Sequence, residues 1–360
     1  MAETGKIRTF IGSNSGKGHE SFKNTLYDAE NMNTVILLKG GAGNGKSTLM
    51  EKLARAAETS EDTVERVYCP SDPGSLDAIV CRGKGFAVLD ATPPHAFEAE
   101  YHCLPEIYLS LSSYIDGGIS SRREAVRELS GELCRVRAQA NRALRAAYEA
   151  DSELCGEVLT YADTGILSSI GAGLAGDLTG RGKEDEKGFR PMRRRFITAV
   201  APGKTVTFSE TPFALLEGKR PETVAVRDRF GLSPFLLGAA ADEAQRHGCE
   251  VWGFFDPLVP ARINGLVMPK TGLCILPEEL VGKADRTVDT EECLSGQSMA
   301  QLGARPEVLL AVKNALLDEA EAKLGECLGI HDKLEAVYRE FTDFAGLDAL
   351  AQELAAEYIL

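Results

Sequence analysis

One stretch of this sequence combines the residue types that hold phosphate groups. Glycines lack a Cβ atom, so the backbone N–H groups around them can close on an anion. A Lys followed by Ser or Thr adds a positive charge for the β- and γ-phosphates and a hydroxyl for Mg²⁺. The stretch fits the pattern G-x-x-x-x-G-K-[ST] and predicts a P-loop that binds ATP with Mg²⁺; its residues are Gly40, Gly41, Ala42, Gly43, Asn44, Gly45, Lys46, Ser47 and Thr48.

Asp90 is predicted to be a second metal ligand. It follows the apolar residues 86–89, so we expect it at the carboxyl end of a strand, where it would hold Mg²⁺ opposite Ser47 and act with Lys46 in catalysis. An aspartate that merely starts a turn is the alternative interpretation. No Glu follows Asp90, where many fast ATPases keep the base that activates water, and this predicts slow hydrolysis.

Other polar residues are weaker candidates. His95 could contact the γ-phosphate, although a loop histidine without a role is an equal alternative. Residues 69–77 carry two carboxylates and two hydroxyls in an expected loop that could position a water or a second substrate, but Asp-Pro-Gly is also ordinary turn chemistry. Arg122, Arg123 or residues 193–195 could supply an arginine finger, although surface arginines usually do not.

The elements around the glycines predict an α/β core. Residues 35–38 are all apolar and run directly into the glycines, as in a central parallel strand, and residues 46–58 have the spacing of an amphipathic helix. Further strands are expected at 63–68 and 86–89. We therefore predict a P-loop NTPase core with a parallel sheet over residues 1–120.

After residue 120 the sequence is rich in charged residues and has the apolar spacing of amphipathic helices. Residues 121–179 are predicted to form a helical appendage, and residues 180–192, with charged residues among glycines, a linker. Residues 291–360 are predicted to form a second helical appendage. Their apolar residues alternate steps of four and three, a seam suited to pairing with the first appendage or with a second chain: Ile330, Leu334, Val337, Phe341 and Phe344.

The sequence of the second half repeats that of the first with weak similarity. Phe10-Ile11 matches Phe196-Ile197, and Phe22 matches Phe208, at a spacing of about 186 residues. Residues 193–290 are therefore predicted to form a second P-loop-like core. It is degenerate, because Ser233 aligns with Lys46, Pro234 with Ser47 and Pro277 with Asp90. We expect one nucleotide per chain, bound in the first half.

Composition narrows the partners. With a formal net charge of -14 over 360 residues, bulk nucleic acid and anionic membranes are not expected to bind. The nine cysteines include no C-x-x-C pair, and no stretch approaches the roughly 18 apolar residues of a membrane span. The expected location is cytoplasmic. A protein partner or self-association through the helices is a further expectation.

The chain resembles a family of uncharacterised bacterial ATPases built from two tandem P-loop NTPase halves. The resemblance spans nearly the whole chain and rests on the segments 10–18, 40–48, 71–77 and 88–95. It implies ATP binding and two P-loop halves, each with a helical appendage, but no particular substrate. In that family the second half tends to keep an intact loop, so this chain departs from it at residues 231–237.

Two functions remain open at this point. An ATP-driven conformational switch or slow ATPase is favoured by the doubled architecture and the helical appendages. A small-molecule kinase that transfers the γ-phosphate of ATP is the alternative. GTP is disfavoured because the sequence contains no N-K-x-D motif.

Overall fold

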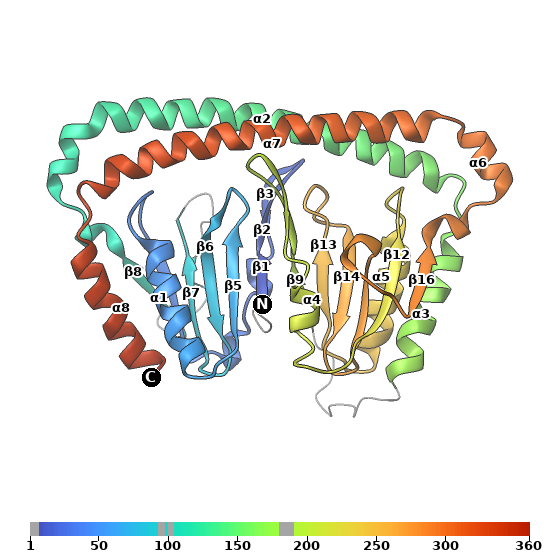
Figure 1. Ribbon diagram of the computed structural model, residues 1–360, viewed down its shortest axis with the longest axis horizontal. Helices are drawn as coiled ribbons and strands as arrows, with labels where there is room; N and C mark the ends of the chain where they lie inside the picture. Colours follow the sequence, from blue (N-terminus) through green and yellow to red (C-terminus); the bar gives the residue numbers. More distant parts are fainter. Residues whose placement is uncertain (1–6, 93–97, 100–103, 180–190) are drawn as a thin grey trace.

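Two six-stranded sheets lie side by side beneath a pair of long helices (Figure 1). The computed structural model describes residues 7–92, 98–99, 104–179 and 191–360. It is a mixed α/β structure. The first sheet has the strand order β1 (Ile7–Phe10), β5 (Val64–Cys69), β6 (Asp72–Cys81), β7 (Phe86–Asp90), β4 (Thr34–Lys39) and β8 (Glu106–Ser110).

The second sheet repeats this order strand for strand. Its order is β9 (Arg193–Arg195), β13 (Trp252–Phe255), β14 (Ile263–Met268), β15 (Leu273–Pro277), β12 (Glu222–Arg227) and β16 (Arg286–Asp289). The registers agree as well, since Leu38 lies opposite Asp90 and Val226 lies opposite Pro277. The structure therefore contains the repeat that the sequence indicates, with Pro277 in the place of Asp90.

Neither sheet is purely parallel, so the prediction of parallel sheets was wrong in this detail. Strand β6 runs antiparallel to both β5 and β7, and β14 does the same in the second sheet. Residues 69–77, predicted to be a loop, instead contribute most of their length to β6. The error has a physical cause: Asp72-Pro73-Gly74 is typical of turns, and β6 pairs with β5 through two register shifts that tolerate such residues.

A helix follows β4 in the first sheet and β12 in the second, and each of these strands lies next to an edge strand of its sheet rather than at the centre that the sequence predicted for residues 35–38. Helix α1 (Lys46–Thr59) buries Leu49 and Leu53 against the first sheet, and α5 (Ser233–Arg246) buries Leu236 and Leu237 against the second. Shorter helices are α4 (Thr211–Ala214) and α6 (Gly296–Leu302). The two strand–loop–helix units are thus the equivalent parts of the two halves.

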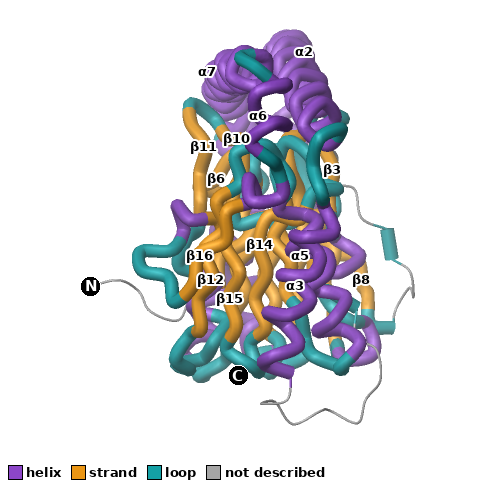
Figure 2. Tube along the Cα trace, turned by 90° about the vertical axis from the view of Figure 1, so that its right-hand side faces the viewer, coloured by secondary structure: helices purple, strands orange, loops and turns teal. Residues whose placement is uncertain are grey.

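The helical appendages cross between the halves. Helices α2 (Arg123–Leu159) and α7 (Arg305–Arg339) pack along each other over both sheets (Figure 1). Helix α3 (Thr164–Thr179) then packs on α5 of the second half (Figure 2), and α8 (Phe344–Tyr358) packs on α1 of the first. Each core is therefore covered by a helix from the other half of the chain.

The predicted seam in the last helix holds only in part. Ile330 and Leu334 are buried on α7, but the helix ends at Arg339, so Phe341 lies in the turn before α8 and Phe344 begins that helix. The partner of α7 in this structure is α2 of the same chain. Of the predicted linker, residues 180–192, the part from 180 to 190 lies outside the residues that the structure describes.

Aromatic stacking joins the two halves at their inner edges. The backbone N–H of Phe10 donates to Phe196 at 2.8 Å, and that of Phe196 donates back at 2.9 Å. Phe10 stacks on Phe208, and Phe22 stacks on Phe196, each with ring centroids 4.7 Å apart. The residues that mark the repeat in the sequence are therefore the ones that pair across its centre.

A buried ion network lies beside these rings. The fully buried Arg195 donates from Nε to Glu65 Oε1 at 2.5 Å and from Nη1 to the carbonyl of Thr25 at 3.0 Å. Arg82 donates to the other carboxylate oxygen at 2.5 Å. Burial alone would raise the pKa of Glu65, but the charges and hydrogen bonds of Arg195, with the charge of Arg82, lower the pKa to about 2. Glu65 is therefore held ionised inside the protein.

Candidate functional site

The glycine stretch forms the turn between β4 and α1. Gly43 (φ 68°) and Gly45 (φ 75°) have left-handed backbone conformations that favour glycine, and α1 begins at Lys46. The Asn44 side chain is buried in the turn, and with its amide oxygen and nitrogen exchanged it donates to Ala42 O at 3.0 Å and accepts from Gly41 N at 3.1 Å. This is the strand–loop–helix geometry in which backbone N–H groups and the positive end of a helix meet an anion.

Lys46 lies over this turn. Its Nζ donates to the carbonyls of Gly40 and Gly41 at 2.8 and 2.7 Å and lies 3.6 Å from Asp90 Oδ2. Asp90 ends β7 next to β4, as the sequence predicts. The structure thus brings together the two residues predicted to be catalytic.

Ser47 and Asp90 are both anchored by neighbouring backbone. Ser47 Oγ accepts from Leu76 N at 2.9 Å, and Asp90 Oδ1 accepts from Thr92 N at 2.8 Å. The hydroxyl of Thr92 donates to Gly40 O at 2.9 Å and so ties the turn to the end of β7. The sequence prediction missed Thr92, although its position two residues after Asp90 suits an Asx turn.

A cavity of about 910 Å³ opens above the turn. Its floor is the stretch 40–48, one wall includes Asp72 and Asp77 of β6, and its roof comes from α2 and α7. The roof contributes Leu133 and Arg137 from α2, and Cys327 and Glu335 from α7. The long helices therefore close the cavity from above.

Helix α7 touches the glycine turn directly. Gly43 N donates to Glu335 Oε1 at 3.3 Å, and a Cβ on Gly43 would come within 2.7 Å of the carbonyl oxygen of Glu335. Arg339 donates to the other carboxylate oxygen at 3.1 Å. No local signal in the sequence could have pointed to this contact, because it joins residues 292 positions apart.

The weaker candidates have other placements. Arg122 pairs with Glu340, and Arg195 belongs to the network around Glu65, so neither is an arginine finger of this cavity. His95 lies outside the described residues. Of the described residues, Arg137 and Arg339 are the arginines that line the cavity, and no sequence pattern singled them out.

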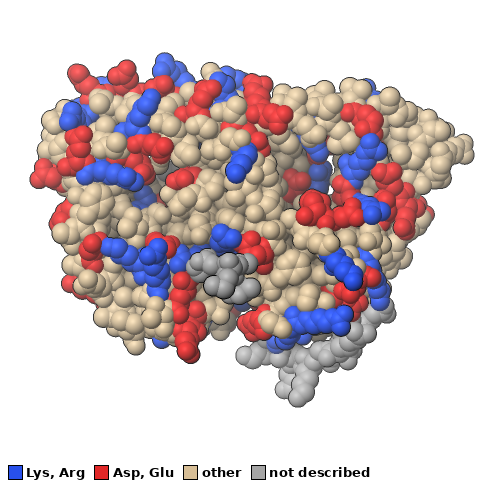
Figure 3. Space-filling model, in the orientation of Figure 1, with Lys and Arg blue, Asp and Glu red and all other residues tan. Residues whose placement is uncertain are grey.

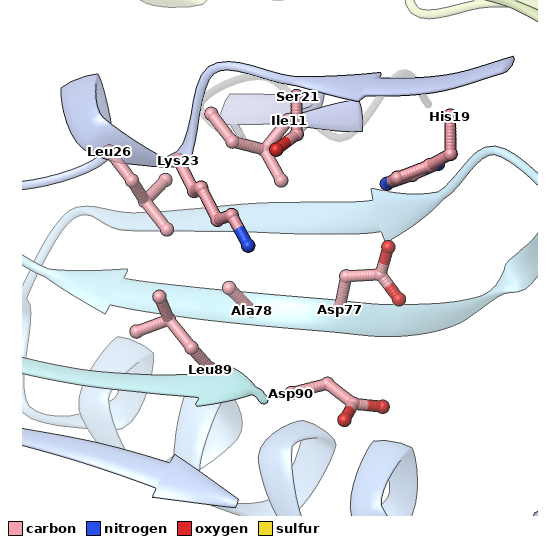
Figure 4. A pocket seen from close by; sticks show the side chains of 9 residues that line it. All are labelled: Ile11, His19, Ser21, Lys23, Leu26, Asp77, Ala78, Leu89 and Asp90. Carbon is pink, nitrogen blue, oxygen red and sulfur yellow. The ribbon is translucent and has the colours of Figure 1, made fainter. Parts of the chain in front are cut away.

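A water-sized pocket shares Asp77 of β6 and Asp90 of β7 with the large cavity. It measures about 20 Å³, and Asp77 and Asp90 line it together with His19 and Lys23 (Figure 4). Burial and the nearby charge of Lys39 lower the pKa of Lys23, against an opposing effect of Glu98. This pocket is too small for a substrate, so the large cavity is the candidate site.

The equivalent turn of the second half is filled by its own carboxylate. Asp228 Oδ1 accepts from Leu232 N at 2.8 Å, and Oδ2 accepts from Ser233 N at 2.7 Å, at the N-terminus of α5. The hydroxyl of Thr290 also donates to Asp228, at 3.0 Å. An internal anion therefore takes the N–H groups that a phosphate would need, and no lysine stands at Ser233.

No family model, curated protein or solved structure matches the chain. Among the described residues, no helix is both long and apolar enough to cross a bilayer, and no three His, Cys, Asp or Glu side chains cluster to hold a metal. On the face shown in Figure 3, lysines and arginines lie scattered among aspartates and glutamates.

Proposed function

We propose that this chain is a P-loop NTPase-type protein that binds Mg-ATP in its first half and acts as a slow ATPase or an ATP-driven conformational switch. The single observation that carries the proposal is the glycine turn between β4 and α1, with Lys46 over it and Asp90 3.6 Å away. A turn of this kind offers N–H groups, a helix N-terminus and a cation to the same anion.

The residues present fit a nucleotide with Mg²⁺. Gly43 N already donates to a carboxylate, so in this structure the turn binds an anionic oxygen. Ser47 Oγ accepts one hydrogen bond and keeps a lone pair for a cation, and Asp90 supplies a carboxylate. When bound, Mg²⁺ would neutralise developing charge on the phosphates, with phosphate oxygens completing its ligands.

A switch suits the position of the helices. Helix α7 contacts the turn through Glu335 and, with α2, runs across the second half as well (Figure 1). A change at the phosphates would therefore reach the second half along this packed helix pair. We further propose that the second half, also P-loop-like, serves as a scaffold, because Asp228 fills its turn.

A small-molecule kinase is the second candidate. It is favoured by the extent of the cavity, about 910 Å³, which continues from the glycine turn to Leu133 and Arg137 on α2 and leaves room for an acceptor. Phosphate release measured with and without a metabolite pool separates the two candidates. A switch or slow ATPase releases phosphate without an acceptor, whereas a kinase gives a phosphorylated metabolite and little free phosphate.

Calorimetric titration with Mg-ATP and Mg-GTP tests the proposal. We expect one ATP per chain and weaker binding of GTP. Two sites per chain would contradict the role given to Asp228, and the absence of any nucleotide binding would overturn the proposed function.

A further inference from the structure

The carboxylate of Glu335 takes a donor that the proposed nucleotide needs. Its Oε1 accepts from Gly43 N at 3.3 Å, and the backbone of Glu335 is so close that a Cβ on Gly43 would meet its carbonyl oxygen at 2.7 Å. In a P-loop, the N–H groups of the glycine turn bind phosphate oxygens. A carboxylate and a phosphate cannot both accept from the same N–H group, so one must replace the other.

The equivalent turn shows what a permanent occupant looks like. Asp228 accepts two backbone N–H groups at 2.8 and 2.7 Å and a hydroxyl at 3.0 Å. Glu335 accepts a single N–H group of its turn at the longer distance of 3.3 Å, and its side chain is 24% exposed. The smaller number of hydrogen bonds and the longer contact distance therefore mark Glu335 as an occupant that can be released.

Two cationic or potentially cationic side chains flank Glu335 on α7. Arg339 donates to Oε2 at 3.1 Å from one turn further along the helix, and His331 Nδ1 lies 3.9 Å from Oε1 from one turn before it. Both line the cavity above the glycine turn. When Glu335 leaves, Arg339 loses its anionic partner at a place where a phosphate has arrived, and a guanidinium binds phosphate oxygens well.

We propose that Glu335 is a built-in phosphate mimic that occupies the glycine turn in the absence of nucleotide, and that ATP displaces it and takes over Arg339 as a ligand. This inference rests on the proposed function, because it requires ATP at the same turn. It assigns α7 as the element that senses the nucleotide, and it makes the affinity for ATP depend on a competition within the chain.

Mg-ATP titration of four variants by calorimetry tests this competition. Glu335→Gln is expected to bind ATP about 10-fold more tightly than the wild type, because the amide is a weaker competitor for the N–H group. Its control, Asp332→Asn, removes the same charge from an exposed position on the same helix and should leave the affinity within about twofold. Arg339→Gln is expected to bind ATP about 10-fold more weakly. Its control, Lys333→Gln, removes a positive charge from another exposed position of α7 and should leave the ATP affinity unchanged.

The outcomes separate this inference from the proposed function. If the wild type and Asp332→Asn bind ATP and Glu335→Gln binds it no more tightly, the proposed function stands and the competition is refuted. If Glu335→Gln alone binds, the competition is supported in its strongest form. If none of the folded variants binds any nucleotide, the proposed function fails and the inference with it. Thermal unfolding of each variant shows that it is folded.

Discussion

The two strand–loop–helix turns of this protein start from the same frame and end with different occupants. The turn before α1 has Lys46 and a contact from a helix of the other end of the chain, whereas the turn before α5 has Ser233 and is filled by Asp228 from its own strand. A helix N-terminus with exposed N–H groups needs an anionic or polar acceptor. In both turns a carboxylate of the chain is that acceptor, but Asp228 lies four and five residues from its donors, whereas Glu335 comes from a distant helix.

The largest expected effect is a loss of Mg-ATP affinity when Lys46 is removed from the first turn. Lys46→Ala should weaken Mg-ATP binding by at least about 100-fold, because a charged donor to the phosphates is lost from a partly buried site. Calorimetric titration measures the affinity, and thermal unfolding checks the fold. Lys52→Ala, on the exposed side of the same helix, is the matched control and should bind as the wild type does. Equal affinity in Lys46→Ala and the control would refute the nucleotide assignment.

The next effect concerns the centre of the repeat, where the first sheet has Glu65 at the position that Trp252 takes in the second sheet. The pKa of Glu65 lies at about 2 in the folded protein, below its ordinary value of 4.5. The unfolded chain therefore binds the proton more readily, so the stability that Glu65 contributes is present above about pH 4.5 and is lost as the pH falls towards about 2.

Urea unfolding at several pH values measures this contribution. Relative to Glu65→Gln, the wild type should be more stable by about 3 kcal/mol near pH 7; more than half of that difference should disappear by about pH 3, and most of it by about pH 2. The two proteins would then have nearly parallel unfolding free energies only below about pH 2. A difference that stays constant from neutral to acidic pH would show that the ionised state of Glu65 is not what stabilises the interface.

A third change removes the occupant of the second turn. Asp228→Ala should lower the free energy of unfolding by about 2 kcal/mol, because the N–H groups of Leu232 and Ser233 lose their acceptor. ATP affinity should stay unchanged. Urea unfolding and calorimetry measure the two quantities, and Asp242→Ala, at an exposed position of α5, is the control for stability. A second ATP site that appears in Asp228→Ala would show that the frame of this half still binds nucleotide.

The smallest effect compares the two glycines with left-handed backbone. Gly43→Ala should cost about 2 kcal/mol of stability, and Gly231→Ala about 1 kcal/mol. Both residues have φ near 70–80°, but a Cβ at Gly43 would meet backbone oxygen of α7 at 2.7 Å, whereas at Gly231 the nearest atoms are the guanidinium of Arg262 at 3.1 Å or more. Equal losses in urea unfolding would mean that α7 yields easily to the added methyl group.

Local pattern was sufficient for the parts of the site that are close in sequence. The run 35–38, the glycines and the spacing of the following helix predicted β4, the turn and α1, because each depends on neighbours within a few residues. The presence of a second core like the first followed from the repeat, whereas the strand order of both sheets came only from the structure. Strand β6 was missed because Asp72-Pro73-Gly74 has turn propensity; in the structure Pro73 and Gly74 lie at a register shift of the β5–β6 pair, and the strand is paired from Leu76 onward.

The crossing of the helices could not be predicted in this way. Because the two halves repeat the same apolar pattern, their cores present similar apolar surfaces. The periodicity of α3 and α8 is therefore compatible with packing on the core of their own half or on that of the other half. The structure places α8 on α1 and α3 on α5. That arrangement sets α7 over the glycine turn and brings Glu335 to Gly43.

The sequence by itself determined that a glycine-rich turn lies between a strand and a helix with Lys46 and Ser47 at its end, that Asp90 ends another strand, and that the second copy lacks all three residues. These properties depend on residue types and on local patterns around each residue, and both can be read from the sequence without the fold. Only the tertiary structure decided which carboxylates lie in the two turns: Asp228 in one and Glu335, 292 residues away from its partner, in the other. Long-range contacts of this kind depend on how whole helices cross, and no local pattern encodes that choice.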